Sequence, residues 1–115
     1  MSINYEDPKF SGKYVYLPRI GERAKFEIVE IYETKSENPK YNFHVREKVA
    51  LPDGREVETD KDLGYRIEAK LKNGKTLVVS SLGAFHAVFR AHKIQDGETI
   101  SVNHIDRGEW KVERE

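Results

Sequence analysis

The sequence predicts a mainly β domain: a five-stranded barrel with one helix between the third and fourth strands and a hairpin inserted between the first and second. Three observations support this prediction. Two alternating runs flank Asn73-Gly74 within residues 64–80, which is typical of a β-hairpin. Apolar residues recur at helical spacing in a short segment after Ser81. The other β-favouring runs are short and end at turn signals such as Asp106-Arg107-Gly108.

Residues 1–20 are expected to form an N-terminal arm, and residues 21–115 the barrel domain. Residues 1–12 are polar and lack periodicity, so we expect a mobile or loosely draped segment. The run Tyr14-Val15-Tyr16-Leu17 favours a strand and is ended by Pro18. It is expected to form an edge strand or to cover exposed apolar side chains.

The first barrel strand is expected at residues 23–35. Ala24, Phe26 and Ile28 alternate there, after which the apolar positions shift to Val29 and Ile31. A phase slip in a long strand indicates a β-bulge. Such a strand can pair in two sheets, as the first strand of a small barrel does.

An inserted hairpin is expected at about residues 36–62. It begins with a turn cluster around Asn38-Pro39, after which Tyr41, Phe43 and Val45 alternate. A second turn at Pro52-Asp53-Gly54 leads to a short run at Glu56-Val57-Glu58. Residues 59–62 are expected to connect this hairpin to the central one.

A two-residue type I′ turn is predicted at Asn73-Gly74, because both residues tolerate positive φ. That register places Ala69 opposite Val78, and paired residues share a face. The face expected to be buried holds Tyr65, Ile67, Ala69, Leu71 and Val78. The outer face is expected to hold Arg66, Glu68, Lys70, Lys72 and Lys75, beside Leu77 and Val79.

A helix is expected over residues 82–93 with Ser81 as its N-cap, because Leu82, Phe85, Val88 and Phe89 fall at helical spacing. Strands are expected at residues 98–104 and 109–113. With the insertion set aside, five strands with a helix between the third and fourth match the oligonucleotide/oligosaccharide-binding (OB) fold.

Four segments of the chain carry a family resemblance: Gly64-Tyr65-Arg66-Ile67-Glu68, Lys72-Asn73-Gly74-Lys75-Thr76-Leu77, Asp96-Gly97-Glu98-Thr99-Ile100 and Gly108-Glu109-Trp110-Lys111-Val112. Their strand and turn pattern resembles small OB-fold single-stranded-DNA-binding proteins of archaea and archaeal viruses. The resemblance covers residues 21–113 and implies an OB fold and single-stranded DNA binding. The long insertion between the first two strands departs from a minimal OB domain.

The composition shows that charge is unevenly distributed along the chain, and it excludes several kinds of functional site. The 115 residues carry no net charge, but residues 64–95 hold six basic residues against Glu68 alone, a local charge of +5. The absence of Cys excludes disulfides and thiol chemistry. No apolar run approaches the roughly 20 residues of a membrane span, so we expect a soluble, cytoplasmic protein without a membrane partner. Abundant Lys and Glu are typical of proteins from thermophiles.

The OB arrangement directs nucleic acid to the central hairpin and to the loops beside it. Eight basic residues are therefore candidates for phosphate contacts: Arg66, Lys70, Lys72 and Lys75 on the hairpin, with Arg46, Lys48, Arg107 and Lys111 extending the groove. Single-strand binding also needs aromatic platforms for the bases. The main candidates for base stacking are Tyr41, Phe43 and Trp110, and Trp110 is equally suited to the core. Tyr14 and Tyr16 are the other aromatic residues that could serve as platforms.

No metal site, cofactor or catalytic activity is expected. His86 and His92 are six residues apart rather than the three or four that place two ligands on one helical face. Phosphate-loop, nucleophile-elbow and zinc signatures are missing from the sequence. The function expected is non-catalytic binding of single-stranded nucleic acid, DNA more than RNA, with little sequence specificity. The alternative is a protein-interaction or oligomerisation module, in its simplest form a homodimer, using Leu77 and Val79 on the outer face.

Overall fold

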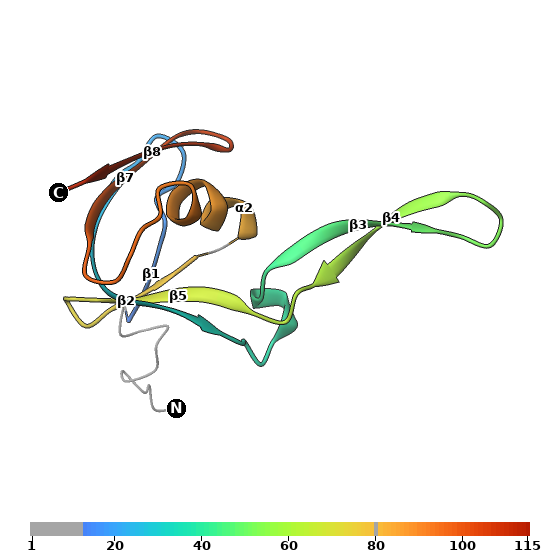
Figure 1. Ribbon diagram of the computed structural model, residues 1–115, viewed down its shortest axis with the longest axis horizontal. Coiled ribbons are helices and arrows are strands. Elements are labelled where there is room, and N and C mark those ends of the chain that lie inside the picture. Colours follow the sequence, from blue (N-terminus) through green and yellow to red (C-terminus); the bar gives the residue numbers. More distant parts are fainter. Residues whose placement is uncertain (1–12, 80) are drawn as a thin grey trace, which may run out of the picture.

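The chain forms a mainly β structure dominated by one curled, six-stranded half-barrel sheet (Figure 1). The structure is a computed structural model that describes residues 13–79 and 81–115. The expected mobile arm at residues 1–12 lies outside the described residues. The sheet has the order β1-β6-β5-β2-β7-β8, and β3 and β4 form a separate two-stranded sheet. The strands are β1 (Tyr14–Tyr16), β2 (Arg23–Thr34), β3 (His44–Ala50), β4 (Glu56–Asp62), β5 (Arg66–Leu71), β6 (Thr76–Val78), β7 (Thr99–Asp106) and β8 (Glu109–Arg114).

Strand β2 is the long, bulged strand that the sequence predicts. Its first half pairs with β7 and its second half with β5, both antiparallel. The register shifts between Ile28 and Glu30, at the position of the apolar phase slip. The bulge leaves Val29 half exposed and returns Ile31 to the core side of the sheet. One strand therefore joins the two halves of the curled sheet.

Strand β1 is an edge strand, as expected, and it pairs in parallel with β6. Its middle residue, Val15, packs against the core, whereas Tyr14 and Tyr16 point to the other face, where they are 36% and 61% exposed. This alternation is the ordinary consequence of the two-residue repeat of a strand. The two tyrosines therefore extend the outer face of the sheet beyond the central hairpin.

The register of the central hairpin differs from the prediction by one residue. Ala69 pairs with Leu77 and Glu68 with Val78. The loop holds three residues, because the Leu71 N–H donates to the Lys75 carbonyl, and Gly74 adopts a φ of 85°. Among the described residues only Lys93 and glycines have positive φ, so Asn73 does not form the predicted type I′ turn. A type I turn closed by a glycine bulge is the usual geometry of such a loop.

This one-residue difference reverses the faces of β6. Leu77 and Val79 are 0% and 1% exposed and belong to the core, whereas both were expected on the outer face. Val78 joins the outer side and is itself covered, at 7% exposure. A one-residue slip moves every side chain of a strand to the opposite face, which is the physical reason for the correction.

The helical segment comprises α2 (Leu82–Ala84) and η2 (Phe85–Arg90), the second part with π-type hydrogen bonding. Ser81 is the predicted N-cap, and its hydroxyl accepts from the Ala84 N–H at 3.1 Å. Val88 and Phe89 bury the apolar side of the segment in the core. The helix ends earlier than expected, and Lys93 with a φ of 51° reverses the chain. Neither part of this segment is long and apolar enough to cross a membrane, and the rest of the described chain holds no helix that is.

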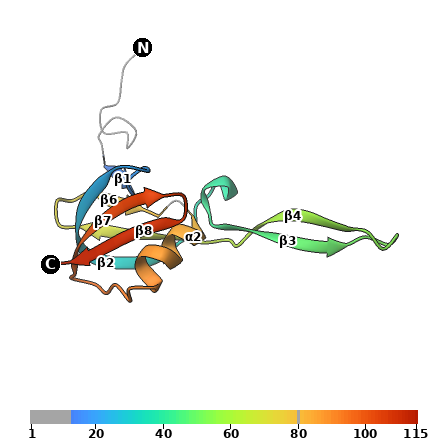
Figure 2. The ribbon, with the colours of Figure 1, turned by 90° about the horizontal axis from the view of Figure 1, so that it is seen from above.

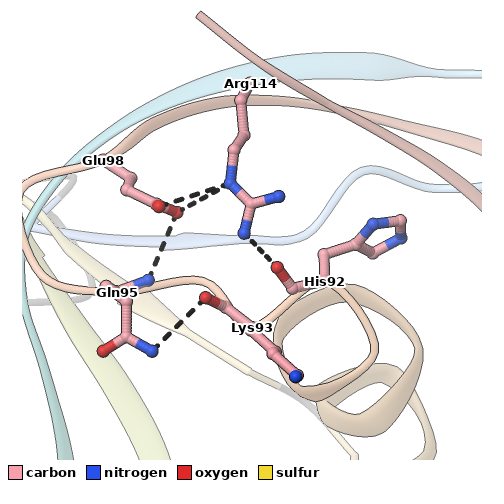
Figure 3. A network of polar contacts seen from close by, with 5 residues as sticks. All are labelled: His92, Lys93, Gln95, Glu98 and Arg114. Atoms are coloured by element: carbon pink, nitrogen blue, oxygen red, sulfur yellow. Dashed lines mark hydrogen bonds and ion pairs between the residues drawn. The ribbon is translucent and has the colours of Figure 1, made fainter.

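A polar network fastens the end of this helical segment to strand β8 (Figure 3). Nε of Arg114 lies 3.2 Å from Oε2 of Glu98, which also accepts from the Gln95 N–H. The guanidinium of Arg114 donates to the His92 carbonyl as well. One side chain of the last strand thus holds both the helix end and the loop before β7.

Strands β3 and β4 form an arm that projects from the half-barrel (Figure 2). The predicted insertion is therefore a hairpin, but residues 59–62 belong to β4 rather than to a connector. The first strand begins at His44, because Pro39–Tyr41 form a 3-10 turn (η1) capped by Asn38. His44 anchors the base of the arm: Nε2 contacts the Pro39 carbonyl at 2.7 Å, and Nδ1 lies 2.7 Å from Asp60. The Pro39 carbonyl first, and then the Asp60 carboxylate, raise the pKa of His44.

Candidate nucleic-acid interface

The outer face of β1, β6, β5 and β2 carries three tyrosines and the hairpin residue Lys70 in two adjacent rows. One row across the sheet runs from Tyr14 through Thr76 and Lys70 to Glu30. The next row runs from Tyr16 through Val78 and Glu68 to Tyr32. Directly opposed residues lie on one face, so both rows point to the same side. We call this surface the Tyr-Lys face and define it by Lys13, Tyr14, Tyr16, Tyr32, Lys70 and Lys75.

A groove of about 450 Å³ runs over this face. Tyr14 and Tyr32 line it, together with Lys13, Lys70 and Lys75. The face thus offers aromatic rings and ammonium groups within one depression. Base stacking and phosphate contact require this combination of groups.

The lysines are held only loosely by acidic neighbours. Nζ of Lys70 lies 3.8 Å from Glu30 and 6.0 Å from the centre of the Tyr32 ring, with 64% of the side chain exposed. Lys72 lies outside the Tyr-Lys face and lines a different depression, where its Nζ is 3.9 Å from Glu27 and 79% of its side chain is exposed. Exposed pairs at such distances contribute roughly 0–1 kcal/mol. A phosphate can therefore displace these carboxylates at little cost.

Arg66 is less available than the lysines. Its guanidinium contacts Oε2 of Glu68, and the two side chains are 19% and 8% exposed. The Tyr32 hydroxyl donates to Oε1 of the same carboxylate at 2.8 Å. Partial burial, and then the Glu68 carboxylate, raise the pKa of Tyr32 to about 12. Glu68 lines the groove, and Arg66 is held by this carboxylate rather than presented as a free charge.

The other predicted phosphate contacts lie away from the Tyr-Lys face. Arg46 and Lys48 are on the projecting arm, where Arg46 is 3.6 Å from Glu58. Arg107 and Lys111 belong to the β7–β8 hairpin, at the opposite end of the strand order, and Lys111 lies 3.2 Å from Glu113. The eight predicted cations therefore do not form one groove.

The three predicted stacking residues have different surroundings. Phe43 is 1% exposed and packs edge-on against Tyr65, with ring centres 5.5 Å apart, so its ring is closed to a base. This corrects the expectation, because Phe43 precedes the arm and points into the core instead of continuing its alternation. Tyr41 is 57% exposed on η1. Trp110 is partly buried and stacks on His104 with ring centres 3.6 Å apart.

Sequence reasoning missed Tyr32 and Lys13 as members of the face. Tyr32 follows the bulge in β2, which decides the face to which it points. Lys13 joins only because β1 adds to the edge of β6 in parallel, where the Thr76 N–H donates to the Lys13 carbonyl. The alternation of Tyr14 and Tyr16 around Val15 was the available signal for a tyrosine-bearing edge strand.

Comparison of the chain with protein-family models, with curated proteins and with solved structures found no match. Within residues 13–79 and 81–115 no group of three or more His, Asp or Glu side chains is placed to hold a metal ion.

Proposed function

We propose that the protein is a non-catalytic OB-fold domain that binds single-stranded nucleic acid, DNA in preference to RNA, with little sequence specificity. The observation behind this proposal is the Tyr-Lys face, where Tyr14, Tyr16 and Tyr32 share one side of the sheet with Lys70. Stacking contributes about 1–3 kcal/mol per base and tolerates any base, because every base has a π-face. The lysines add sequence-independent, salt-sensitive affinity.

The strand order supports the OB assignment. The five strands β6-β5-β2-β7-β8 are consecutive in the sheet, and the helical segment lies between β6 and β7 in the chain. The arm lies between β2 and β5, where OB domains place a ligand-binding loop. Strand β1 occupies the free edge of β6 and supplies two of the three tyrosines.

A binding titration with a labelled oligothymidylate, followed by fluorescence anisotropy, tests the proposal. We expect binding at low salt that weakens as salt rises, with a slope of about −0.7 for each phosphate contacted. The double variant Lys70→Glu/Lys75→Glu should weaken binding and flatten that slope. Tyr14→Ala/Tyr16→Ala should weaken binding while leaving the slope unchanged.

The control is Arg55→Glu, the same kind of charge reversal at the exposed tip of the arm. It should bind as the unmodified protein does. A chain that fails to bind at low salt would refute the proposal, and so would equal losses in Arg55→Glu and in the lysine variant. A matched ribonucleotide strand measures the preference for DNA.

A second candidate, a protein-interaction module, is favoured by the arm. Strands β3 and β4 pair with each other in a sheet of their own, and the opposed residues Val49 and Val57 are 40% and 38% exposed. An isolated two-stranded hairpin is only marginally stable in water. Leu77 and Val79, which were expected to form the interaction surface, do not support this candidate because both are buried. Light scattering over a concentration series, repeated with Val49→Ser, tests for self-association through the arm.

A further inference from the structure

A second depression lies apart from the Tyr-Lys face, between the β7–β8 turn, the start of the helical segment and the segment that follows β1. Its volume is about 540 Å³, within the range of small-molecule sites. Trp110, His104, Arg107, Arg19 and Ser81 are among its lining residues. We call it the tryptophan pocket. None of these residues lines the groove over the Tyr-Lys face.

One wall of the pocket is a pair of stacked rings. Trp110 and His104 are opposed on β8 and β7, and their ring planes are inclined by only 9°. The Pro18 carbonyl, which can only accept, lies 3.0 Å from Nδ1 of His104, so this nitrogen carries the proton. In the neutral ring Nε2 is then an acceptor, and it is a buried atom with no hydrogen-bond partner in the described chain. Because this nitrogen is fully buried, it lies out of reach of a ligand in the pocket, and His104 contributes to the wall through its stacked ring.

The charged residues that line the pocket are all positive. Arg19 and Arg107 line it, and both are exposed. The described residues that line the pocket include no Asp or Glu. Two acidic residues, Asp106 and Glu109, adjoin lining residues in the sequence without lining the pocket themselves, and Asp106 accepts from the Arg107 N–H at 2.7 Å. Two guanidinium groups without a lining carboxylate favour an anion, and guanidinium geometry suits phosphate.

We propose that the tryptophan pocket binds one nucleotide, with its base against the Trp110–His104 wall and its phosphate at Arg19 and Arg107. An aromatic ring with an attached phosphate matches both features of the pocket, the aromatic wall and the two lining arginines. The ligand has two possible sources with the same chemistry, a free mononucleotide or the phosphorylated end of a strand. The inference uses residues outside the Tyr-Lys face and does not depend on the proposed function.

The pocket supplies its own probe, because Trp110 is the single tryptophan of the chain. Thymidine 5′-monophosphate should quench the fluorescence of Trp110 saturably, and thymidine without phosphate should bind more weakly. Arg107→Gln and Arg19→Gln should each weaken the mononucleotide by about tenfold or more, the effect of losing one hydrogen bond to a charged group. Lys111→Gln, on the same strand as Trp110 but outside the pocket, is the matched control and should change nothing.

Oligothymidylate with and without a 5′-phosphate distinguishes the two sources. Tighter quenching by the phosphorylated strand than by the mononucleotide assigns the pocket to a strand end, and the reverse order assigns it to a free nucleotide. The absence of saturable quenching by all of these probes would overturn the proposal. It would also be overturned if both arginine variants bound the mononucleotide as tightly as Lys111→Gln does.

The same samples separate this inference from the proposed function. The Lys70→Glu/Lys75→Glu variant should lose affinity for the labelled strand and keep the quenching by the mononucleotide. Quenching that disappears together with strand binding in this variant would show that Trp110 reports on the Tyr-Lys face, and the separate pocket would be rejected.

Discussion

The Tyr32 hydroxyl donates a hydrogen bond of 2.8 Å to Oε1 of Glu68, while Arg66 contacts the other oxygen of the same carboxylate. Glu68 is 6% exposed, although it lies on the outer side of the sheet. A buried carboxylate needs such partners, because its desolvation is otherwise costly. This cluster sets the position of the Tyr32 ring within the Tyr-Lys face.

Removing one member of this cluster should destabilise the fold. Glu68→Ala leaves Arg66 partly buried without its partner, and we expect a loss of about 3 kcal/mol in the free energy of unfolding. Glu30→Ala removes an exposed carboxylate 3.8 Å from Lys70 and should cost less than about 1 kcal/mol. Urea denaturation of both variants measures the difference. Equal losses of unfolding free energy in the two variants would mean that the buried Glu68 contributes no more to stability than the exposed Glu30.

The phenol of Tyr32 should lose its proton at a higher pH than an ordinary tyrosine does. Its pKa is raised to about 12 in the folded chain, against about 10 when unfolded. Because the folded pKa is the higher one, the stability linked to this proton is complete below pH 10 and is lost as the pH rises toward 12. The ultraviolet titration of the unmodified protein minus that of Tyr32→Phe isolates this group. In Glu68→Gln the pH midpoint of the Tyr32 titration should fall. An unchanged midpoint would show that Glu68 does not raise the pKa of Tyr32.

Phe43 and Tyr41 lie two residues apart, but only the loss of the Phe43 side chain should strongly reduce stability. Phe43→Ala empties a site that is 1% exposed and should cost about 3–5 kcal/mol of stability. Tyr41→Ala removes a ring that is 57% exposed and should change stability by no more than about 0.5 kcal/mol. Thermal unfolding of the two variants makes the comparison. A Phe43→Ala protein of unchanged stability would contradict the burial of Phe43 in the core.

Two glycines provide a test of the hairpin loop. A Cβ would meet no atom within 4 Å at Gly74 or at Gly83, but only Gly74 has a positive φ, 85°. Gly74→Ala should therefore cost about 1–2 kcal/mol through backbone strain alone. Gly83→Ala, within the helical segment, should be neutral or stabilise by up to about 1 kcal/mol. Chemical denaturation of both proteins checks this, and a harmless Gly74→Ala would favour a loop in which Gly74 is not left-handed.

Local patterns were sufficient wherever neighbouring residues decide the structure. The phase slip from Ile28 to Val29 predicts the bulge of β2, and Ser81 predicts the helix cap, because both signals lie within a few residues. The turn at residues 52–54 and the alternating runs beside it predict a hairpin, and β3 pairs with β4 in this way. For the candidate site, the sequence predicts Lys70 and Lys75. It also offers Tyr14 and Tyr16, both as an edge strand or cover for the sheet and as further platforms for bases.

The tertiary structure decided what depends on register and on long-range pairing. A loop of three residues instead of two shifts β6 by one position, and a strand with a two-residue repeat then exchanges its faces, which buries Leu77 and Val79. The parallel pairing of β1 with β6 joins segments about sixty residues apart, and no local signal encodes it. The sequence by itself determined the order of most strands, the places where the chain turns and the start of the helix. Only the fold decided which of their side chains meet, because contacts across a sheet are set by register and not by propensity.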